Sequence, residues 1–216
     1  MGRTEIDKLM KADTLVYKLP ETKLEKNMEL YDKYGVFAIA VQNGKYAGHT
    51  MLLGTRKLNK KSFSGLKTSL FKKDVDVQLY FVRPTFIIEC NLNSTFDAAG
   101  KPAHFKGKIN AKLELANPQK FVNFVEQFSA DRKGIIVTEA DMGGFIIGAA
   151  ITEMIPAGKV RAFKPGDPSV HGGRTHETYM GHLVFRTYFR PENVNRYTAI
   201  GLKARSIEVE PIELSF

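Results

Sequence analysis

The stretch HFKGKINAKLELANPQKFVNF, from His104 to Phe124, changes its hydrophobic period half-way. Up to Leu115, apolar and polar side chains alternate, which predicts a long strand with one dry face and one wet, Lys-rich face. Beyond Asn117-Pro118 the apolar residues recur at helical spacing; they are Phe121, Phe124, Val125 and Phe128. Asparagine can cap a helix and proline suits its first position. The strand should therefore run straight into a helix.

Four further strand patterns precede this stretch. Residues 14–20, TLVYKLP, predict a short strand that proline stops, and a charged connector follows. The apolar run from Val36 to Val41 leads to Asn43-Gly44, a strong hairpin signal because both residues tolerate positive φ. The segment VDVQLYFV should then turn at Arg83-Pro84 into the strand TFIIECNL. One face of VDVQLYFV should be dry, and it carries Val75, Val77, Leu79 and Phe81.

Helical patterns dominate the rest of the chain. Residues 135–155 predict one helix, apolar on most of its circumference, although each interior glycine costs about 1 kcal/mol against alanine. Those glycines, which should pack closely against another element, are Gly143, Gly144 and Gly148. Residues 175–190 and 191–199 predict two more helices, and GLKARSIEVEPIEL predicts a closing strand. The order predicts one α+β domain over residues 1–216, mainly β over 14–116 and mainly α with a final strand over 117–216. An antiparallel or mixed sheet from the first half should pack with helices from the second.

Composition restricts the functional classes. The 216 residues carry a net charge of +9 and a pI near 9.5, which favours anionic partners. Cys90 is the only cysteine, so an intrachain disulfide is excluded, and its place in a strand pattern predicts a buried thiol. The charged first residues do not resemble a signal peptide. The longest apolar run, Met142 to Ile151, is too short to span a membrane, so we expect a cytoplasmic protein.

Catalytic motifs are missing from the sequence. It has no P-loop, no G-x-G-x-x-G after a strand and no G-x-S-x-G elbow. The weak candidates for a metal site are His171, His176 and His182. Their spacings of five and six residues do not share a helix face, so solvated histidines are the simpler interpretation. We therefore expect no enzyme and no cofactor.

The segment from Thr55 to Asp74 is strongly basic. Its cations are Arg56, Lys57, Lys60, Lys61, Lys67, Lys72 and Lys73, and its apolar residues are Phe63, Leu66, Leu70 and Phe71. Cations interleaved with apolar anchors suit an anionic membrane surface. The same composition could bind phosphate backbones, with rings stacked on bases. A third interpretation is a solvated loop whose Phe63 and Phe71 fold back onto the core.

Several segments together resemble the SPFH or band-seven superfamily (stomatin, prohibitin, flotillin), and most of all its virion-core-protein-like branch. They are VQLYFVRPTFIIE, KGKINAKLELANPQKFVNFV and YTAIGLKARSIEVEPIEL. Asn117, Pro118 and Phe121 match the family's helix start, and Ile200-Gly201-Leu202 loosely matches its closing turn. The resemblance implies an α+β domain that scaffolds membrane-associated assemblies, often rings, without being an enzyme.

The resemblance and the open strand face together lead us to expect a homo-oligomer or a protein partner, with a peripheral position on an anionic membrane. The candidate subunit interface consists of Lys106, Lys108, Lys112, Gly144 and Gly148. The alternative is a basic nucleic-acid-binding protein or a structural protein of a phage or virion.

Overall fold

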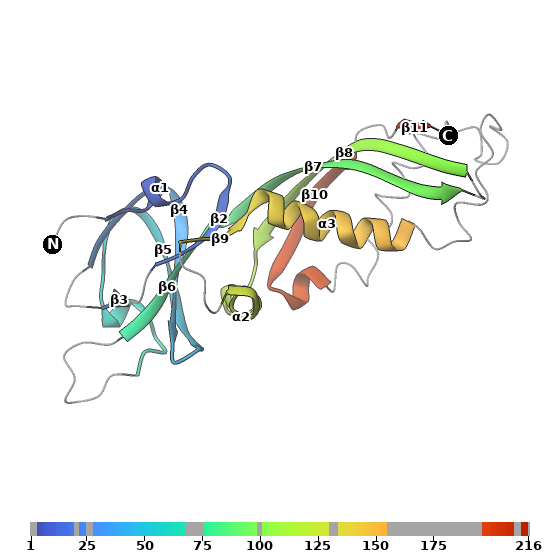
Figure 1. Cartoon of the computed structure of the whole chain (residues 1–216). Helices are drawn as coiled ribbons and strands as arrows, with labels where there is room; N and C mark the ends of the chain where they lie inside the picture. The colour runs from blue at the N-terminus through green and yellow to red at the C-terminus, as the bar shows by residue number, and fades with distance from the viewer. Residues whose placement is uncertain are drawn as a thin grey trace. The chain divides into compact units, whose positions relative to one another are not determined.

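The computed structural model describes residues 4–19, 22–24, 28–67, 76–98, 101–129, 134–154, 196–209 and 213–215 (Figure 1). Its strands are β1 (Thr4–Glu5), β2 (Thr14–Lys18), β3 (Thr22–Lys23), β4 (Met28–Gln42), β5 (Lys45–Leu58), β6 (Asp76–Val82), β7 (Thr85–Ala98), β8 (Lys101–Leu115), β9 (Gly134–Thr138), β10 (Leu202–Val209) and β11 (Glu213–Ser215). Its helices are α1 (Ile6–Leu9), α2 (Pro118–Ser129), α3 (Glu139–Met154) and the 3-10 turn η1 (Lys60–Ser62). The predicted mixture of helices with antiparallel and mixed sheets is confirmed, and strands predominate.

The chain forms two compact units, each built from three segments. The first unit contains Met1–Phe86, Glu114–Glu139 and Thr198–Lys203, and the second contains Ile87–Leu113, Ala140–Tyr197 and Ala204–Phe216. The chain therefore passes from one unit to the other several times, and the units do not divide at residue 116.

Strand β6 lies inside the sheet of the first unit. The sheet has the order β1-β4-β6-β2-β9, with β5 on β4 and β3 on β6. Val77, Leu79 and Phe81 on one face of β6 are buried, as predicted, but Tyr80 and Val82 on the other face are fully buried too. The predicted apolar face of β6 is therefore confirmed for these three residues, and the opposite face is covered as well. A strand with neighbours on both edges and cover on both faces has no wet side.

Strands β4 and β5 form the hairpin predicted at Asn43-Gly44, whose φ angles are 52° and 70°. The hairpin is longer than predicted, because β4 already begins at Met28 in the expected charged connector. A register shift between Asp32 and Val36 interrupts the pairing of β4 with β5, beside Gly54. The Asp32 carboxylate accepts hydrogen bonds from the backbone N–H groups of Tyr34 at 3.0 Å and Gly35 at 2.5 Å, which holds this bulge.

The predicted passage from strand to helix at Asn117-Pro118 is confirmed. Helix α2 begins at Pro118, and the Asn117 side chain accepts a hydrogen bond from the Lys120 N–H at 3.0 Å. The Gly201 carbonyl accepts from the N–H groups of Ala116 and Asn117, both at 2.9 Å. The helix start and the turn before β10, far apart in sequence, therefore hold each other in place.

The second unit contains the long strands β7 and β8, and Figure 1 shows α3 running beside them. The period-two prediction for β8 is confirmed, since Ile109, Ala111 and Leu113 are buried and Lys112 is exposed. Gly143 of α3 lies against β7, where a Cβ would be 3.3 Å from the Cys90 sulfur. Close packing thus accounts for Gly143, as predicted.

Two predictions for the segment after Gly134 are wrong. Residues 134–138 form β9, which pairs with β2, and the helix begins only at Glu139. Ile135, Ile136, Val137 and Thr138 are β-branched, and such residues fit a sheet better than a helix. Gly144 is exposed, with no described residue within 4 Å of the position of a Cβ, so close packing among the described residues does not explain it.

The end of the chain is described in part. Residues 196–199 are helical, as predicted, while the predicted helix over 175–190 lies outside the described residues. The closing strand is present as β10, which pairs with β8, and β11 pairs with the other part of β8.

Candidate functional site

The described part of the basic segment, Thr55 to Lys67, contains regular structure. Thr55–Leu58 are the end of β5, and η1 follows directly. The Asn59 side chain accepts from the Lys61 N–H at 2.9 Å, while the Ser62 hydroxyl accepts from the Asn59 N–H at 3.1 Å. The Asn59 side chain also accepts from the Ser62 N–H, which completes a capping box that fixes the turn. The part of the segment outside the described residues includes Leu70, Phe71, Lys72 and Lys73.

Phe63 is not available as a membrane anchor or as a stacking platform. Its side chain is 2% exposed and belongs to the hydrophobic cluster between β4, β5, β6 and α1, against which Leu66 packs. The expectation that Phe63 is an exposed anchor is therefore wrong. For this residue the third interpretation is right, in which the ring folds back onto the core. Burying a Phe side chain is worth about 2 kcal/mol, which favours the core over the surface.

The segment after η1 returns to the end of the β4–β5 hairpin. The Gly65 N–H donates to the Ala47 carbonyl at 2.9 Å. The Gln42 side chain joins Lys67 twice, donating to its carbonyl at 3.1 Å and accepting from its N–H at 3.0 Å. The backbones approach so closely that a Cβ on Gly48 would lie 3.0 Å from the Ser64 nitrogen.

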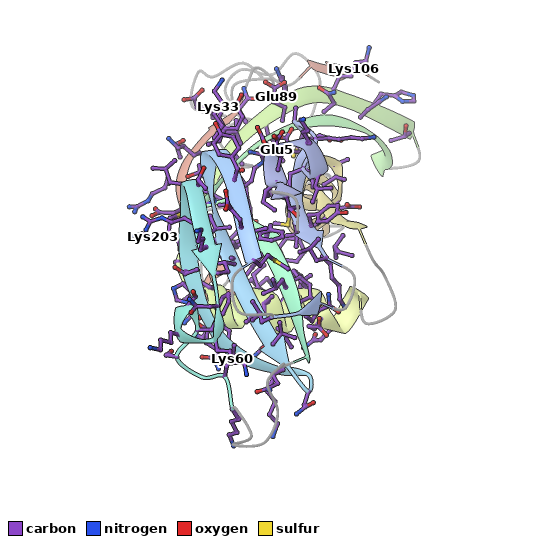
Figure 2. All side chains as sticks on the ribbon, turned by 90° about the vertical axis from the view of Figure 1, so that its left-hand side faces the viewer. Glu5, Lys33, Lys60, Glu89, Lys106 and Lys203 are labelled. Carbon is purple, nitrogen blue, oxygen red and sulfur yellow. The ribbon has the colours of Figure 1, made fainter. Side chains whose placement is uncertain are left out.

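This return brings Lys67 beside Lys45 at the hairpin end, where both line one hollow, and the end of β5 and η1 carry the other described cations of the segment. We call the group the basic surface; it consists of Lys45, Arg56, Lys57, Lys60, Lys61 and Lys67. All are exposed except Lys60, which is half-buried, and Figure 2 shows Lys60 on the turn that follows β5. Among the described residues, no ion pair joins a carboxylate to Lys45, Lys61 or Lys67. The sequence predicted most of these cations but not Lys45, because only the tertiary fold brings it to them.

Two hollows adjoin the hairpin end. The larger, about 750 Å³, is lined by Gln42, Asn43, Lys45, Tyr46, Ala47, Gly65 and Lys67. The smaller, about 430 Å³, is lined by Gly44, Lys45, Tyr46, Gln119, Asn123 and Glu126. Lys45 and Tyr46 thus separate a hollow on the basic side from one beside α2. Burial raises the pKa of the Tyr46 hydroxyl, which is hydrogen-bonded to His49, so the hydroxyl keeps its proton at neutral pH.

An apolar patch that the sequence reasoning missed lies at the β4–β5 bulge. Tyr34, Met51 and Leu53 are 66%, 41% and 60% exposed, and a Cβ on Gly35 would be within 4 Å of both Met51 and Leu53. The adjacent apolar residues Met51, Leu52 and Leu53 carried the signal. In an alternating strand, such a run places at least one apolar side chain on the wet face.

A buried charge pair connects α2 with the sheet. Lys18 of β2 is 4% exposed, and its ammonium lies 3.3 Å from the Glu126 carboxylate and 5.2 Å from the centre of the Tyr80 ring. A buried lysine is costly unless it is paired, so this contact helps to fix α2 over the face of β6 that carries Tyr80. The sequence offered no signal for the pair, whose members are 108 residues apart.

The predicted subunit interface is exposed only in part. Lys106 and Lys112 are exposed on β8, whereas Lys108 is half-buried and pairs with Glu89 of β7 at 3.0 Å. Gly144 is exposed on α3, and Gly148 belongs to the same helix. Lys106 and Lys112 remain open to a partner.

The groups that could carry chemistry are unremarkable in the described part. Cys90 is buried, and burial raises the pKa of its thiol to about 11, so it is protonated at neutral pH and a poor nucleophile. Among the described residues, no three histidine, cysteine or carboxylate side chains are grouped to hold a metal. The candidate histidines His171, His176 and His182 lie outside the described residues.

No protein-family model and no curated protein matches the chain. Within the described ranges, no helix is long and apolar enough to cross a membrane. The features of the described residues that bear on function are therefore those of the chain's own surface, above all the basic surface.

Proposed function

We propose that this protein is a non-enzymatic assembly module of the SPFH type whose basic surface binds an anionic membrane from one side. The observation that carries the proposal is the meeting of Lys45 and Lys67 at the hairpin end, where both line one hollow, without a described carboxylate paired to either of them. Each cation near an anionic leaflet contributes on the order of 1 kcal/mol, so several together give measurable binding.

The SPFH character of the proposal rests on the resemblance and on one contact. The two motifs that carry the resemblance, the helix start at Asn117-Pro118 and the turn at Gly201, are hydrogen-bonded to each other. Each motif by itself is too degenerate to support the resemblance. Because the two motifs are in contact with each other, they support it together.

The buried ring of Phe63 changes the kind of membrane contact that we propose. Without that ring, the described basic surface offers charge and few apolar anchors, so binding should be electrostatic and weaken as salt screens it. The same burial removes a stacking platform for nucleic acid, which is why we favour the membrane.

The test is co-sedimentation of the whole chain with phosphatidylserine-containing vesicles at low and high salt. Binding at low salt, reduced at least several-fold by Lys45→Gln, Lys57→Gln, Lys61→Gln and Lys67→Gln together, would support the proposal. A chain that stays in the supernatant at low salt, or a variant that binds as well as the parent, would overturn it.

A further inference from the structure

The larger hollow at the hairpin end has walls from three separate parts of the chain. Gln42 comes from the end of β4, Lys45 and Tyr46 from the start of β5, and Lys67 from the segment after η1. The paired hydrogen bonds between Gln42 and Lys67 fix one wall, and the bond from Gly65 to Ala47 fixes the base. Its volume of about 750 Å³ is within the range of small-ligand sites.

The charge of this hollow has one sign. Its described lining includes two lysines and no carboxylate. Among the described residues that line the neighbouring smaller hollow, Glu126 is the one carboxylate, and it lies 3.3 Å from the Lys18 ammonium. Lys45 and Lys67 are both exposed at the rim, where their ammonium groups can reach a ligand.

The polar groups of the hollow suit an oxyanion. Lysine donates as a compact charge that readily binds phosphate. Gln42, Asn43 and Tyr46 add neutral polar side chains to the lining. A phosphomonoester carries a charge of about −1.5 to −2 and three acceptor oxygens at neutral pH, more than a carboxylate or a phosphodiester offers.

We infer that the hollow between Gln42, Lys45, Tyr46 and Lys67 is a binding site for a phosphomonoester group. This inference rests on the proposed function in one respect, because a phosphorylated lipid headgroup is one source of the group. A soluble phosphate ester is the other source, and the experiment separates them.

The experiment measures binding of the whole chain to two kinds of vesicle with equal zeta potential. One contains phosphatidylinositol 4-phosphate and the other phosphatidylserine. The site predicts about tenfold tighter binding to the phosphoinositide vesicles, which corresponds to about 1.4 kcal/mol. Lys45→Gln with Lys67→Gln should abolish this preference. The matched control, Lys60→Gln with Lys61→Gln, removes the same charge outside the hollow and should weaken both kinds of binding by one common factor.

A second arm titrates inositol 4-phosphate into the chain and follows the amide signals of residues 42–47. Saturable shifts that the Lys45→Gln, Lys67→Gln variant loses support the site, even if the chain ignores both vesicles; in that case the membrane role fails and the site stands. Vesicle binding without lipid preference, together with no saturable shift, overturns the site and leaves the membrane role standing. Failure in both arms overturns both proposals.

Discussion

Gly201 is the residue at which one added methyl group should matter most. Its φ is 82°, and a Cβ would overlap the Asn117 carbonyl oxygen and lie 2.8 Å from the Phe121 nitrogen. Because both neighbours are backbone atoms of the helix start, they cannot move aside cheaply. We expect Gly201→Ala to lower the free energy of unfolding by about 3 kcal/mol or more, measured by urea denaturation.

The matched control for that substitution is Gly144→Ala. Gly144 is exposed inside α3 with open space around it, so alanine should stabilise the helix by up to about 1 kcal/mol. Equal effects of the two substitutions would show that the contact between the turn and the helix start is not tight in solution.

Asp32 predicts a dependence of stability on pH. Burial raises the pKa of its carboxyl above the ordinary value of 3.8, so the folded chain holds this proton more tightly than the unfolded chain does. The stability from this group is therefore complete at acid pH, below the ordinary pKa, and is lost as the pH rises through the raised pKa. Asp32→Asn keeps an oxygen that can accept from Tyr34 and Gly35 but cannot ionise.

The expected result is that Asp32→Asn gains stability relative to the parent as the pH rises above the ordinary carboxyl pKa of 3.8 toward neutrality. Unfolding curves collected across this range measure the difference. If the variant instead becomes less stable than the parent toward neutral pH, this prediction is wrong. The charged carboxylate then stabilises the bulge through the two hydrogen bonds that it accepts from backbone N–H groups.

At the scale of the element, the attachment of α2 depends on the pair of Lys18 and Glu126. Glu126→Ala removes the carboxylate from a lysine that is 4% exposed, and we expect a loss of about 2 to 3 kcal/mol in the free energy of unfolding. Lys18→Met combined with Glu126→Leu should recover most of this loss, because a buried ion pair can be replaced by apolar side chains.

The pair of Lys108 and Glu89 provides the control. Its side chains are 31% and 65% exposed, so Glu89→Ala should cost less than about 1 kcal/mol. A similar cost for Glu89→Ala and Glu126→Ala in thermal or urea unfolding would mean that burial does not strengthen the first pair.

At the scale of the whole molecule, we expect self-association with a salt dependence opposite to that of membrane binding. Chains with a net charge of +9 repel each other, so added salt should favour assembly while it weakens attachment to anionic vesicles. Light scattering at several concentrations and salt levels gives the mass. A mass that stays monomeric under all these conditions would contradict self-association.

The open face of β8 is the proposed contact in such an assembly. Lys106→Glu with Lys112→Glu should change the measured mass, whereas Lys203→Glu, an exposed lysine on β10, should act only through net charge. If each reversed charge changes the measured mass by the same amount in the two variants, the interface does not lie on the open face of β8.

The sequence could predict the elements whose signals are local. The alternation along β8, the cap at Asn117-Pro118 and the turn at Asn43-Gly44 all depend on residues a few positions apart, and the structure confirms each of them. The short run Ile135 to Thr138 could not be separated from the apolar helix after it, because four apolar or β-branched residues show no period. Only pairing with β2 makes this run a strand.

The sequence by itself determined the alternating faces, the helix start and the excess of basic residues, since side-chain period, capping and charge are properties of neighbouring positions. Only the tertiary structure decided what covers each face. It buried both sides of β6, placed Phe63 in the core and brought Lys67 to Lys45 across the hairpin end. These outcomes depend on contacts between segments far apart in the chain, which no local pattern encodes.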